Sequence, residues 1–435
     1  MGQLQNSTTT STKDHFVSVP LDYALPNGEQ ICIYAREITS NRYQATPQYL
    51  LFLQGGPGQM ADRPIRLDGW LKVALQYYKV ILLDQRGTGR SAPINRQTLR
   101  LRGDSQEQAR YLSHFRADSI VKDAECIRMH IAGRGQPWSI LGHSFGGFCA
   151  ITYLSHAPEG VSEAYISGGL PGLSVDALDV YKTAYPRVER KNIRYYEIYP
   201  GDIRKVREIV EYLHDHKVRL PDSSRLTVQA FQSLGRILGY TEGFQTLHYI
   251  LEEAFISGST GIELSDRFLE EVRNKISFLT NPLYAIMHEP IYAQGSATNW
   301  AAERALMNFP QFNYQTALAQ DAPILFTGEM IYPWMFELDP ALQPLYETAQ
   351  ILANYDRWPP IYDVRQLAVN QVPVAACIFL DDMYVDNVHS QQTAQIIRDI
   401  KLWITDEYDH DGFRGADGAV MKRLIGMLRY PSNAN

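Results

Sequence analysis

The chain has 435 residues, of which 45% are hydrophobic and 20% are charged, and its formal net charge is −7. This length predicts one large domain or two, and the composition is typical of a soluble globular protein. The negative charge argues against a nucleic-acid-binding protein, because no basic run accompanies it. No apolar run is long enough to cross a membrane, and four cysteines are too few for a disulfide framework.

The first 170 residues alternate short apolar runs with helical stretches. Gly, Pro, Asn or Asp bound the runs. Strands are therefore predicted at residues 16–19, 31–38, 49–53, 80–83, 139–141 and 164–166. One helix is predicted over residues 106–132, where apolar side chains recur at helical spacing, and the polar stretch Ser7–Thr12 is expected to be disordered. Strands that alternate with helices indicate an α/β fold with a mostly parallel sheet, covered by helices on both faces.

The composition changes after about Pro171. Residues 172–355 have helical periodicity and no convincing strand run, and repeated Pro and Gly divide them into short helices. Within them a basic cluster at residues 187–194 is mixed with acids and tyrosines, which predicts a solvated helix face.

Strand character returns near the end of the chain. Strands are predicted at residues 372–380 and 402–405, and helices at residues 391–399 and 418–428. We therefore expect an α/β core formed by residues 13–171 and 356–435, interrupted by a helical cap domain of residues 172–355.

The strongest chemical motif is Gly142-His143-Ser144-Phe145-Gly146-Gly147, which matches G-x-S-x-G. It follows a predicted strand and precedes a predicted helix. In such a sharp turn the serine is exposed, and the flanking glycines avoid Cβ clashes. The start of the helix aims free N–H groups at the charge that develops on a substrate. This context predicts a serine hydrolase of the α/β-hydrolase fold with Ser144 as the nucleophile.

A second motif, Gln54-Gly55-Gly56-Pro57-Gly58, directly follows the predicted strand at residues 49–53. In this fold the backbone N–H groups of such a loop and of the residue after the nucleophile form the oxyanion hole. We assign these two donors to Gly56 and Phe145.

A serine nucleophile also needs a base and a carboxylate that orients the base, and in this fold both follow late strands. The strand at residues 372–380 runs into Asp381 and Asp382, and the strand at residues 402–405 is followed by His410. Adjacent strand residues face opposite sides, so only one of the two aspartates can point toward the site. Asp386 competes for the same role.

Other histidines are weaker candidates. His389 comes before the intervening helix, and His143 lies inside the tight turn, where its side chain would project away from the serine hydroxyl. The pair at His214 and His216 has no nearby ligands and predicts a solvated loop rather than a metal site.

Together these motifs resemble those of the prolyl aminopeptidases (proline iminopeptidases), α/β hydrolases that remove an N-terminal proline from peptides. Gln54–Gly58 is similar to the family's H-G-G-P-G loop, with Gln54 where the family has His. Asp84–Ser91 is similar to its D-Q-R-G-x-G-x-S signature, and the G-x-S-x-G turn matches as well. Segments at residues 288–294, 327–332 and 381–386 are similar to the longer bacterial branch, which has an enlarged cap. The family's Asp-to-His spacing favours Asp382 over Asp381.

The resemblance implies a serine aminopeptidase that releases N-terminal proline, or a similar small residue, through an acyl-enzyme, without a metal or cofactor. Its substrate would be a peptide or small aminoacyl compound with a free N-terminus. A protonated amine is best recognised by a buried carboxylate. Glu289 and Glu329, in cap segments rich in Tyr, Trp and Met, are the candidates, and either could instead be structural.

Two alternatives stay open. The same scaffold could carry an esterase, an amidase or a broader aminopeptidase, or it could bind a ligand without chemistry. Haloalkane dehalogenases and epoxide hydrolases place Asp at the position of Ser144 and are excluded. With no signal-peptide pattern and few cysteines, we expect a cytoplasmic protein.

Overall fold

An eight-stranded sheet forms the centre of the computed structural model, which describes residues 10–41, 48–258 and 261–430. The strand order across the sheet is β1-β2-β4-β3-β5-β6-β9-β10. Its strands are β1 (Thr10–Pro20), β2 (Gln30–Ser40), β3 (Tyr49–Leu53), β4 (Lys79–Leu83), β5 (Trp138–His143), β6 (Val161–Ser167), β9 (Val374–Phe379) and β10 (Ile400–Thr405). Strands β4, β3, β5, β6, β9 and β10 are parallel to one another. At one edge, β1 pairs antiparallel with β2, and β2 pairs antiparallel with β4.

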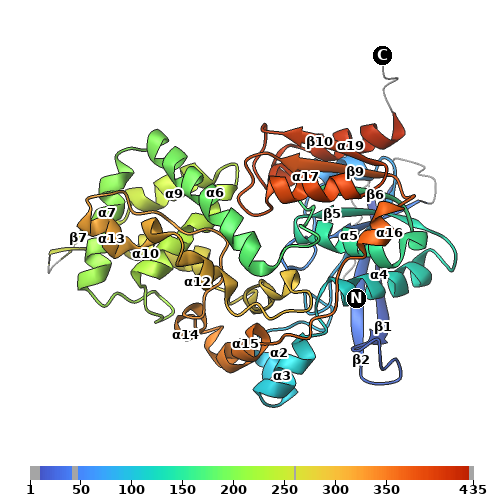
Figure 1. The fold of residues 1–435 in the computed structure, drawn as a ribbon, viewed down its shortest axis with the longest axis horizontal. Coiled ribbons are helices and arrows are strands. Elements are labelled where there is room, and N and C mark those ends of the chain that lie inside the picture. The colour runs from blue at the N-terminus through green and yellow to red at the C-terminus, as the bar shows by residue number, and fades with distance from the viewer. Residues whose placement is uncertain (1–9, 42–47, 259–260, 431–435) are drawn as a thin grey trace.

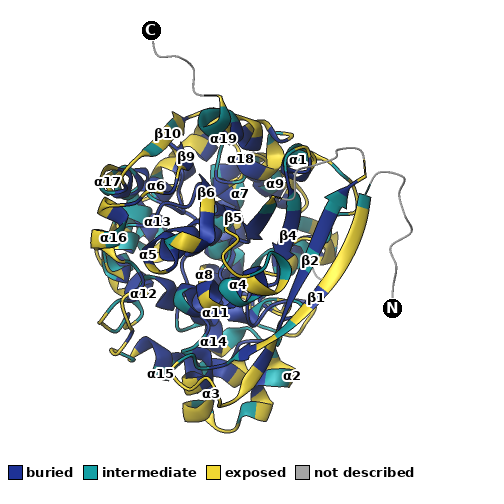
Figure 2. Cartoon of the chain, turned by 90° about the vertical axis from the view of Figure 1, so that its right-hand side faces the viewer, coloured by how far each residue is buried: buried dark blue, intermediate teal, exposed yellow. Residues whose placement is uncertain are grey.

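Strands β3, β4 and β9 are apolar over nearly their whole length because helices cover both faces of the sheet. Along β3, Leu51 and Leu53 pack into one core cluster and Leu50 and Phe52 into the other. Successive side chains of a strand point to opposite faces, so a run of apolar residues suits a sheet buried on both sides. The exposed side chains of β1 mark the edge of this sheet (Figure 2).

Helices α4 and α5 pack on one face, and α1 and α19 pack on the other. The helices that flank the sheet are α1 (Gly69–Ala74), α2 (Arg96–Leu99), α3 (Ser105–Leu112), α4 (Ala117–Ile131), α5 (Phe145–His156), α16 (Val364–Ala368), α17 (Asn387–Ile396), α18 (Gly412–Gly415) and α19 (Ala419–Arg429). Two 3₁₀ turns, η1 (Arg100–Arg102) and η2 (Pro158–Gly160), connect them. This arrangement confirms the predicted mostly parallel sheet with helices on both faces.

A largely helical segment separates β6 from β9 and forms the left-hand half of the molecule in Figure 1. Its helices are α6 (Ala177–Ile198), α7 (Asp202–Asp215), α8 (Val228–Gln232), α9 (Gly243–Glu252), α10 (Asp266–Ile276), α11 (Pro282–Met287), α12 (Ala301–Leu306), α13 (Tyr314–Ala319), α14 (Met335–Leu338) and α15 (Tyr346–Ala353). Four 3₁₀ helices lie among them: η3 (Ser233–Gly239), η4 (Pro290–Tyr292), η5 (Pro310–Phe312) and η6 (Gln343–Leu345). We call this segment the insertion.

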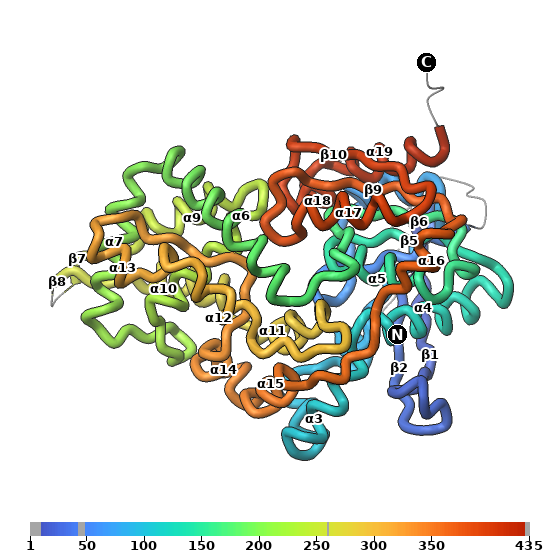
Figure 3. The backbone as a smooth tube through the Cα atoms, viewed as in Figure 1, coloured from blue at the N-terminus to red at the C-terminus, as the bar shows by residue number. Residues whose placement is uncertain are grey.

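After the insertion the chain returns to the sheet beside the strand that it left. β9 pairs in parallel with β6, and Ala164 lies opposite Val374 across the two strands. The tube in Figure 3 shows these two strands side by side, although the insertion separates them in sequence. The carboxyl ends of β3, β5, β9 and β10 therefore lie along one edge of the sheet.

Several predictions from the sequence were wrong in detail. The helix predicted over residues 106–132 is two helices, because the chain is extended at Arg116, whose guanidinium donates to Ala293 O and, at 2.7 Å, to Pro359 O. The insertion contains a short hairpin, β7 (Phe255–Gly258) and β8 (Gly261–Leu264), where no strand was predicted. Residues 10–12 of the stretch expected to be disordered belong to β1, and residues 7–9 lie outside the described part.

The basic cluster at residues 187–194 is not a solvated face. Arg187 and Lys191 are buried and pair with carboxylates of the sheet, whereas Arg190 and Arg194 are exposed. Residues four apart share a helix face, so the inward face of α6 carries two of the four cations.

Candidate active site

Ser144 lies at the turn between β5 and α5, with φ 54° and ψ −127°. A residue with a side chain adopts this conformation only at a cost of about 1–3 kcal/mol, which the surrounding packing must offset. The serine is the N-cap residue of α5, so the first N–H groups of that helix have no partner in the preceding turn. The strained turn thus exposes the hydroxyl beside free backbone donors.

The glycines around Ser144 allow the turn to press against the sheet. A Cβ on Gly142 would lie 2.3 Å from Gly146 O, and one on Gly146 would lie 1.9 Å from Leu53 O. Both distances are far below van der Waals contact with backbone atoms that cannot move aside. The motif therefore requires Gly at these two positions for packing.

His410 and Asp382 form a buried pair on the loops that follow β10 and β9. The Nδ1 atom of His410 lies 2.6 Å from Oδ2 of Asp382, and both side chains are buried. Because the carboxylate can only accept, the proton belongs on Nδ1, and Nε2 is left as the basic nitrogen. The other carboxylate oxygen, Oδ1, accepts the backbone N–H groups of Tyr384 at 2.8 Å and Val385 at 3.1 Å.

The surrounding charges favour the protonated form of His410. Burial acts to lower the pKa of His410, but attraction to the Asp382 carboxylate outweighs it, and the pKa is raised above its ordinary value. The neighbouring His143 shows the opposite effect, because burial and the nearby His410 hold its pKa well below the usual range. His143 therefore stays neutral, with Nδ1 at 3.1 Å from Ser167 O.

The other candidates from the sequence do not form the pair with His410 or Asp382. The side chain of Asp381 is largely exposed and pairs with Lys191, and Asp386 pairs with Arg187 at 2.6 Å and caps α17. His389 lies within α17, next to Asp386. His143 lines the cavity, with its ring stacked on Phe413 and 5.2 Å from the ring of His410.

The loop Gln54–Gly58 lies directly against Ser144. A Cβ on Gly55 would be 3.1 Å from the Cβ and 3.7 Å from the Oγ of Ser144, so a side chain there would crowd the serine. The N–H of Gly55 donates to its neighbour Gln54 Oε1 at 3.2 Å. Gly56, with φ 129°, lines the cavity beside Ser144.

Gln54 ties this loop to the loop that carries His410. Its Oε1 accepts the Arg414 Nη2 group at 2.6 Å, and its Nε2 donates to Met60 O at 3.1 Å. Arg414 belongs to α18, which begins directly after Asp411. Two residues of that helix lie between Arg414 and Asp411, and His410 precedes Asp411. The side chain that replaces the family's His is therefore buried, and both its oxygen and its nitrogen are hydrogen-bonded.

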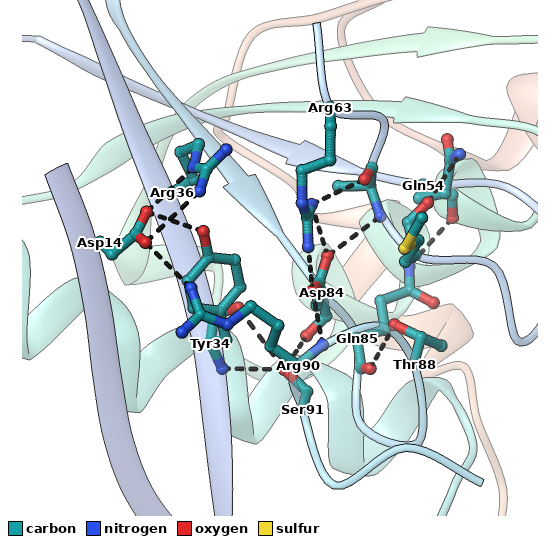
Figure 4. Close-up of polar contacts among 12 residues, drawn as sticks. Asp14, Tyr34, Arg36, Gln54, Arg63, Asp84, Gln85, Thr88, Arg90 and Ser91 are labelled. Atoms are coloured by element: carbon teal, nitrogen blue, oxygen red, sulfur yellow. Dashed lines mark hydrogen bonds and ion pairs between the residues drawn. The ribbon is translucent and has the colours of Figure 1, made fainter. Parts of the chain in front are cut away.

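The Asp84–Ser91 segment supports the same loop from behind (Figure 4). Gln85 Nε2 donates to Gln54 O at 2.9 Å. Asp84 is buried and accepts from the Arg63 side chain and from the N–H groups of Ala61 and Arg90. Gln85 thus holds the backbone of the loop, and neither Asp84 nor Gln85 is among the residues that line the cavity.

A cavity of about 1000 Å³ opens between the sheet and the insertion. Both sides contribute side chains to its wall. From the sheet side it is lined by Gly55, Gly56, His143, Ser144 and His410, and from the insertion by Arg236, Tyr240, Tyr284 and Glu329. Ser144, His410 and two carboxylates of the insertion, Glu242 and Glu329, therefore border one space.

Glu329 lies in the extended segment between α13 and α14. The Tyr284 hydroxyl donates to its Oε1, and burial raises the pKa of Tyr284 well above its ordinary value, so that hydroxyl stays protonated. Earlier residues of the segment are held by side chains, since Asn192 bonds Phe326 N at 2.8 Å and Phe326 O at 2.9 Å. The carboxylate of Glu329 is half-buried and lines the cavity, and its Oε2 accepts no hydrogen bond from the described residues.

Glu289 is placed differently. Its two carboxylate oxygens accept the N–H groups of Ala301 at 3.0 Å and Ala302 at 2.9 Å, at the start of α12. Burial raises the pKa of Glu289, and these backbone donors act against that rise. Glu289 is not among the residues that line the cavity.

Within residues 10–41, 48–258 and 261–430, no group of three His, Cys, Asp or Glu side chains is arranged to hold a metal ion. In the same part of the chain, no helix combines the length and apolar character that a bilayer crossing needs.

Reasoning from sequence missed three contributors. Tyr284 and Arg236 line the cavity, and Lys191 joins the two loops of the sheet that carry Asp382 and His410. Each comes from the insertion, where the helical pattern shows which residues face inward but not what they meet. For Lys191 the sequence held one signal: it lies four residues after Arg187, so the two cations share one face of the helix.

Comparison with known proteins was consistent with this geometry. Residues 48–196 match the family model described as "alpha/beta hydrolase fold", which confirms the predicted fold class. The chain is 44% identical to a proline iminopeptidase of Aeromonas sobria, over 95% of this chain and 96% of that protein. It is 33% identical to the proline iminopeptidase aneH of Aspergillus aculeatus, over 96% of this chain and 93% of that protein.

Proposed function

Because the chain belongs to the proline iminopeptidase family of α/β hydrolases, we propose that it releases N-terminal proline, or a similar small residue, from peptides. The reaction passes through an acyl-enzyme on Ser144. It needs no metal or cofactor, since the nucleophile, the base and the oxyanion donors are all supplied by the chain.

In the first step Ser144 Oγ attacks the carbonyl carbon of the N-terminal residue. Nε2 of His410 takes the hydroxyl proton and then gives it to the nitrogen of the leaving peptide. Asp382 holds the imidazole in the required tautomer and stabilises the cation that forms. Water then attacks the acyl-enzyme by the same route in reverse, which frees the amino acid and restores the serine.

The tetrahedral intermediates carry a negative oxygen that needs fixed donors. We assign these to the N–H groups of Gly56 and Phe145. Phe145 is the first residue of α5, so its N–H points away from the helix body. The N–H of Gly55 is already bonded to Gln54, which leaves Gly56 as the donor from that loop.

The protonated amine of the substrate is assigned to Glu329. A carboxylate that lines the cavity with free lone pairs can accept its charged N–H groups. Glu289, whose oxygens are both engaged by backbone N–H groups, supports the site by holding the start of α12. The rings of Tyr284 and Tyr240 give the apolar wall that a pyrrolidine ring would contact.

The observation that carries this proposal is the presence of Ser144, His410 and Glu329 around one cavity. A test compares arylamides of proline, alanine and hydroxyproline with N-acetylproline arylamide and a simple aryl ester. We expect the free proline arylamide to be cleaved fastest and the acetylated compound very poorly, because acetylation removes the charge that Glu329 would bind. Equal turnover of the acetylated compound or the ester would instead support an amidase or esterase.

We also propose a cytoplasmic location. All four cysteines, Cys32, Cys126, Cys149 and Cys377, are unpaired, as in a reducing compartment.

A further inference from the structure

Lys191 joins the two loops that carry the base and its orienting carboxylate. Its Nζ lies 2.6 Å from Asp409 Oδ1 and 2.8 Å from Asp381 Oδ2. Asp409 immediately precedes His410, and Asp381 immediately precedes Asp382. One ammonium group of the insertion is therefore bonded to the chain neighbour of each member of the His410–Asp382 pair.

The position of this lysine is unusual for a cation. Only 5% of Lys191 is exposed, and burying an ammonium group is costly unless its hydrogen bonds are satisfied. Two carboxylates from two loops meet that need, whereas Lys182, on the same helix, forms an exposed pair with Asp179 at 3.2 Å.

Further contacts from the insertion reach the same loops. Arg187, one turn before Lys191 on α6, bonds Asp386 at 2.6 Å on the Asp382 loop. Thr241 donates its N–H at 2.9 Å and its hydroxyl at 2.7 Å to Asp411, the residue after His410. A further contact has its donor on the Asp382 loop: the Tyr384 hydroxyl donates to the backbone oxygen of Arg236 in the insertion. The insertion therefore contacts both loops, at residues that flank His410 and Asp382 in the chain.

We propose that Lys191 is a positioning residue, which fixes the separation of the two loops so that His410 and Asp382 stay aligned with Ser144. The inference rests on the proposed roles of those three residues. It makes the catalytic alignment depend on the insertion as well as on the sheet, whose strands β9 and β10 end at Phe379 and Thr405, before both loops. A displacement of about 1 Å at a reacting group costs up to roughly 100-fold in rate.

The same arrangement predicts a signature in the pH profile. Removing the ammonium group leaves Asp381 and Asp409 as unpaired negative charges near His410, and negative charge raises the pKa of an imidazole. His410 must be neutral to act as a base, so the acid limb of kcat/KM would move to higher pH. Other charged or titratable groups around this imidazole are Asp382, Glu329, Asp411, His143 and Tyr384, whose ring lies 4.7 Å from that of His410, and the substitution leaves them in place.

The test measures proline arylamide turnover by Lys191→Met across the pH range, beside wild type and the control Lys182→Met. We expect kcat to fall about 10- to 100-fold with KM within about twofold, and the acid limb to move to higher pH. Lys182→Met should match wild type in all three measures. Circular dichroism and thermal unfolding of each variant report whether it is folded.

A second variant keeps the test decisive if Lys191→Met does not fold. Asp381 is largely exposed, so Asp381→Asn should fold, and it removes one of the two bonds to Lys191. We expect kcat a few-fold lower and, since a negative charge is lost, an acid limb moved to lower pH. A folded Lys191→Met with wild-type kcat and an unmoved limb would overturn the inference, as would an unchanged Asp381→Asn. If wild type itself fails to cleave the arylamide, the proposed function fails instead.

Discussion

The two sides of the cavity are built by different means. On the sheet side, Gly142 and Gly146 press the serine turn onto the sheet, and strand ends carry Asp382 and His410, whose loops also bond Arg187 and Lys191 of the insertion. On the insertion side, the Glu329 segment is held by side chains of other helices. Under the proposed roles, changes at the serine turn should alter the chemical step, and changes at Glu329 should alter recognition of the amine.

The largest effect should come from Ser144→Ala on the sheet side. Removing the nucleophile should lower kcat by about 10³-fold or more, while the protein stays folded. Steady-state kinetics with proline arylamide, together with circular dichroism, measures both. Near-normal activity would remove the central assignment.

His410→Ala should be almost as damaging, because no other described base shares a hydrogen bond with Asp382. His389→Ala is the matched control and should stay close to wild type, since its side chain lies on α17 beside Asp386. The kcat of both variants decides between them. The reverse outcome would mean that the loops after β9 and β10 have been assigned the wrong roles.

Asp382→Asn should lower kcat by about 10³-fold, because the amide no longer fixes the imidazole tautomer. It should also change the pH profile. The Asp382 carboxylate raises the pKa of His410 against the effect of burial, so its neutralisation should lower that pKa and move the acid limb of kcat/KM to lower pH. An acid limb that stays in place would assign it to a different group.

A smaller effect is expected on the insertion side. Glu329→Gln keeps the shape and removes the charge, so kcat/KM for proline arylamide should fall about 10- to 100-fold, without loss of Ser144 labelling by a small phosphonate. Glu289→Gln should act mainly on stability, lowering the free energy of unfolding by about 1–2 kcal/mol, because one N–H at the start of α12 loses its acceptor. The opposite pattern, with Glu289→Gln weakening substrate and Glu329→Gln not, would exchange the two roles.

The smallest effect should follow Gln54→Ala. It removes the bonds to Gly55 N–H, Met60 O and Arg414 but leaves the backbone donors of the loop in place. We expect kcat to fall a few-fold with KM unchanged. A loss as large as that of Ser144→Ala would show that the side chain itself takes part in the reaction.

The contrast between the two sides also explains what the sequence could reveal. The serine turn, the glycine loop and the order strand, Asp, strand, His are local patterns, which are enough to propose Ser144, Gly56, Phe145 and His410; the choice of Asp382 came from the resemblance to the family. The structure brings Asp382 to His410 and pairs Asp381 with Lys191 instead, a choice that strand alternation alone left open.

The insertion was harder to interpret because its contacts are not local. Sequence could not separate Glu329 from Glu289, since both lie among aromatic residues and only their partners differ. It also could not show that Arg187 and Lys191 meet carboxylates of the sheet. The break at Arg116 was missed for the same reason, because its partners lie in distant segments.

The parallel pairing of β6 with β9 has a consequence for the folding of the newly synthesised chain. Everything from β1 to β6, including the serine turn, is synthesised before the insertion, but β9, β10 and the two loops beyond them come last. Contacts between segments so far apart in the chain carry a high contact order and form slowly. Under the proposed roles, a nascent chain therefore carries Ser144 long before it has His410 to activate it, and hydrolytic activity would begin only when the final strands dock.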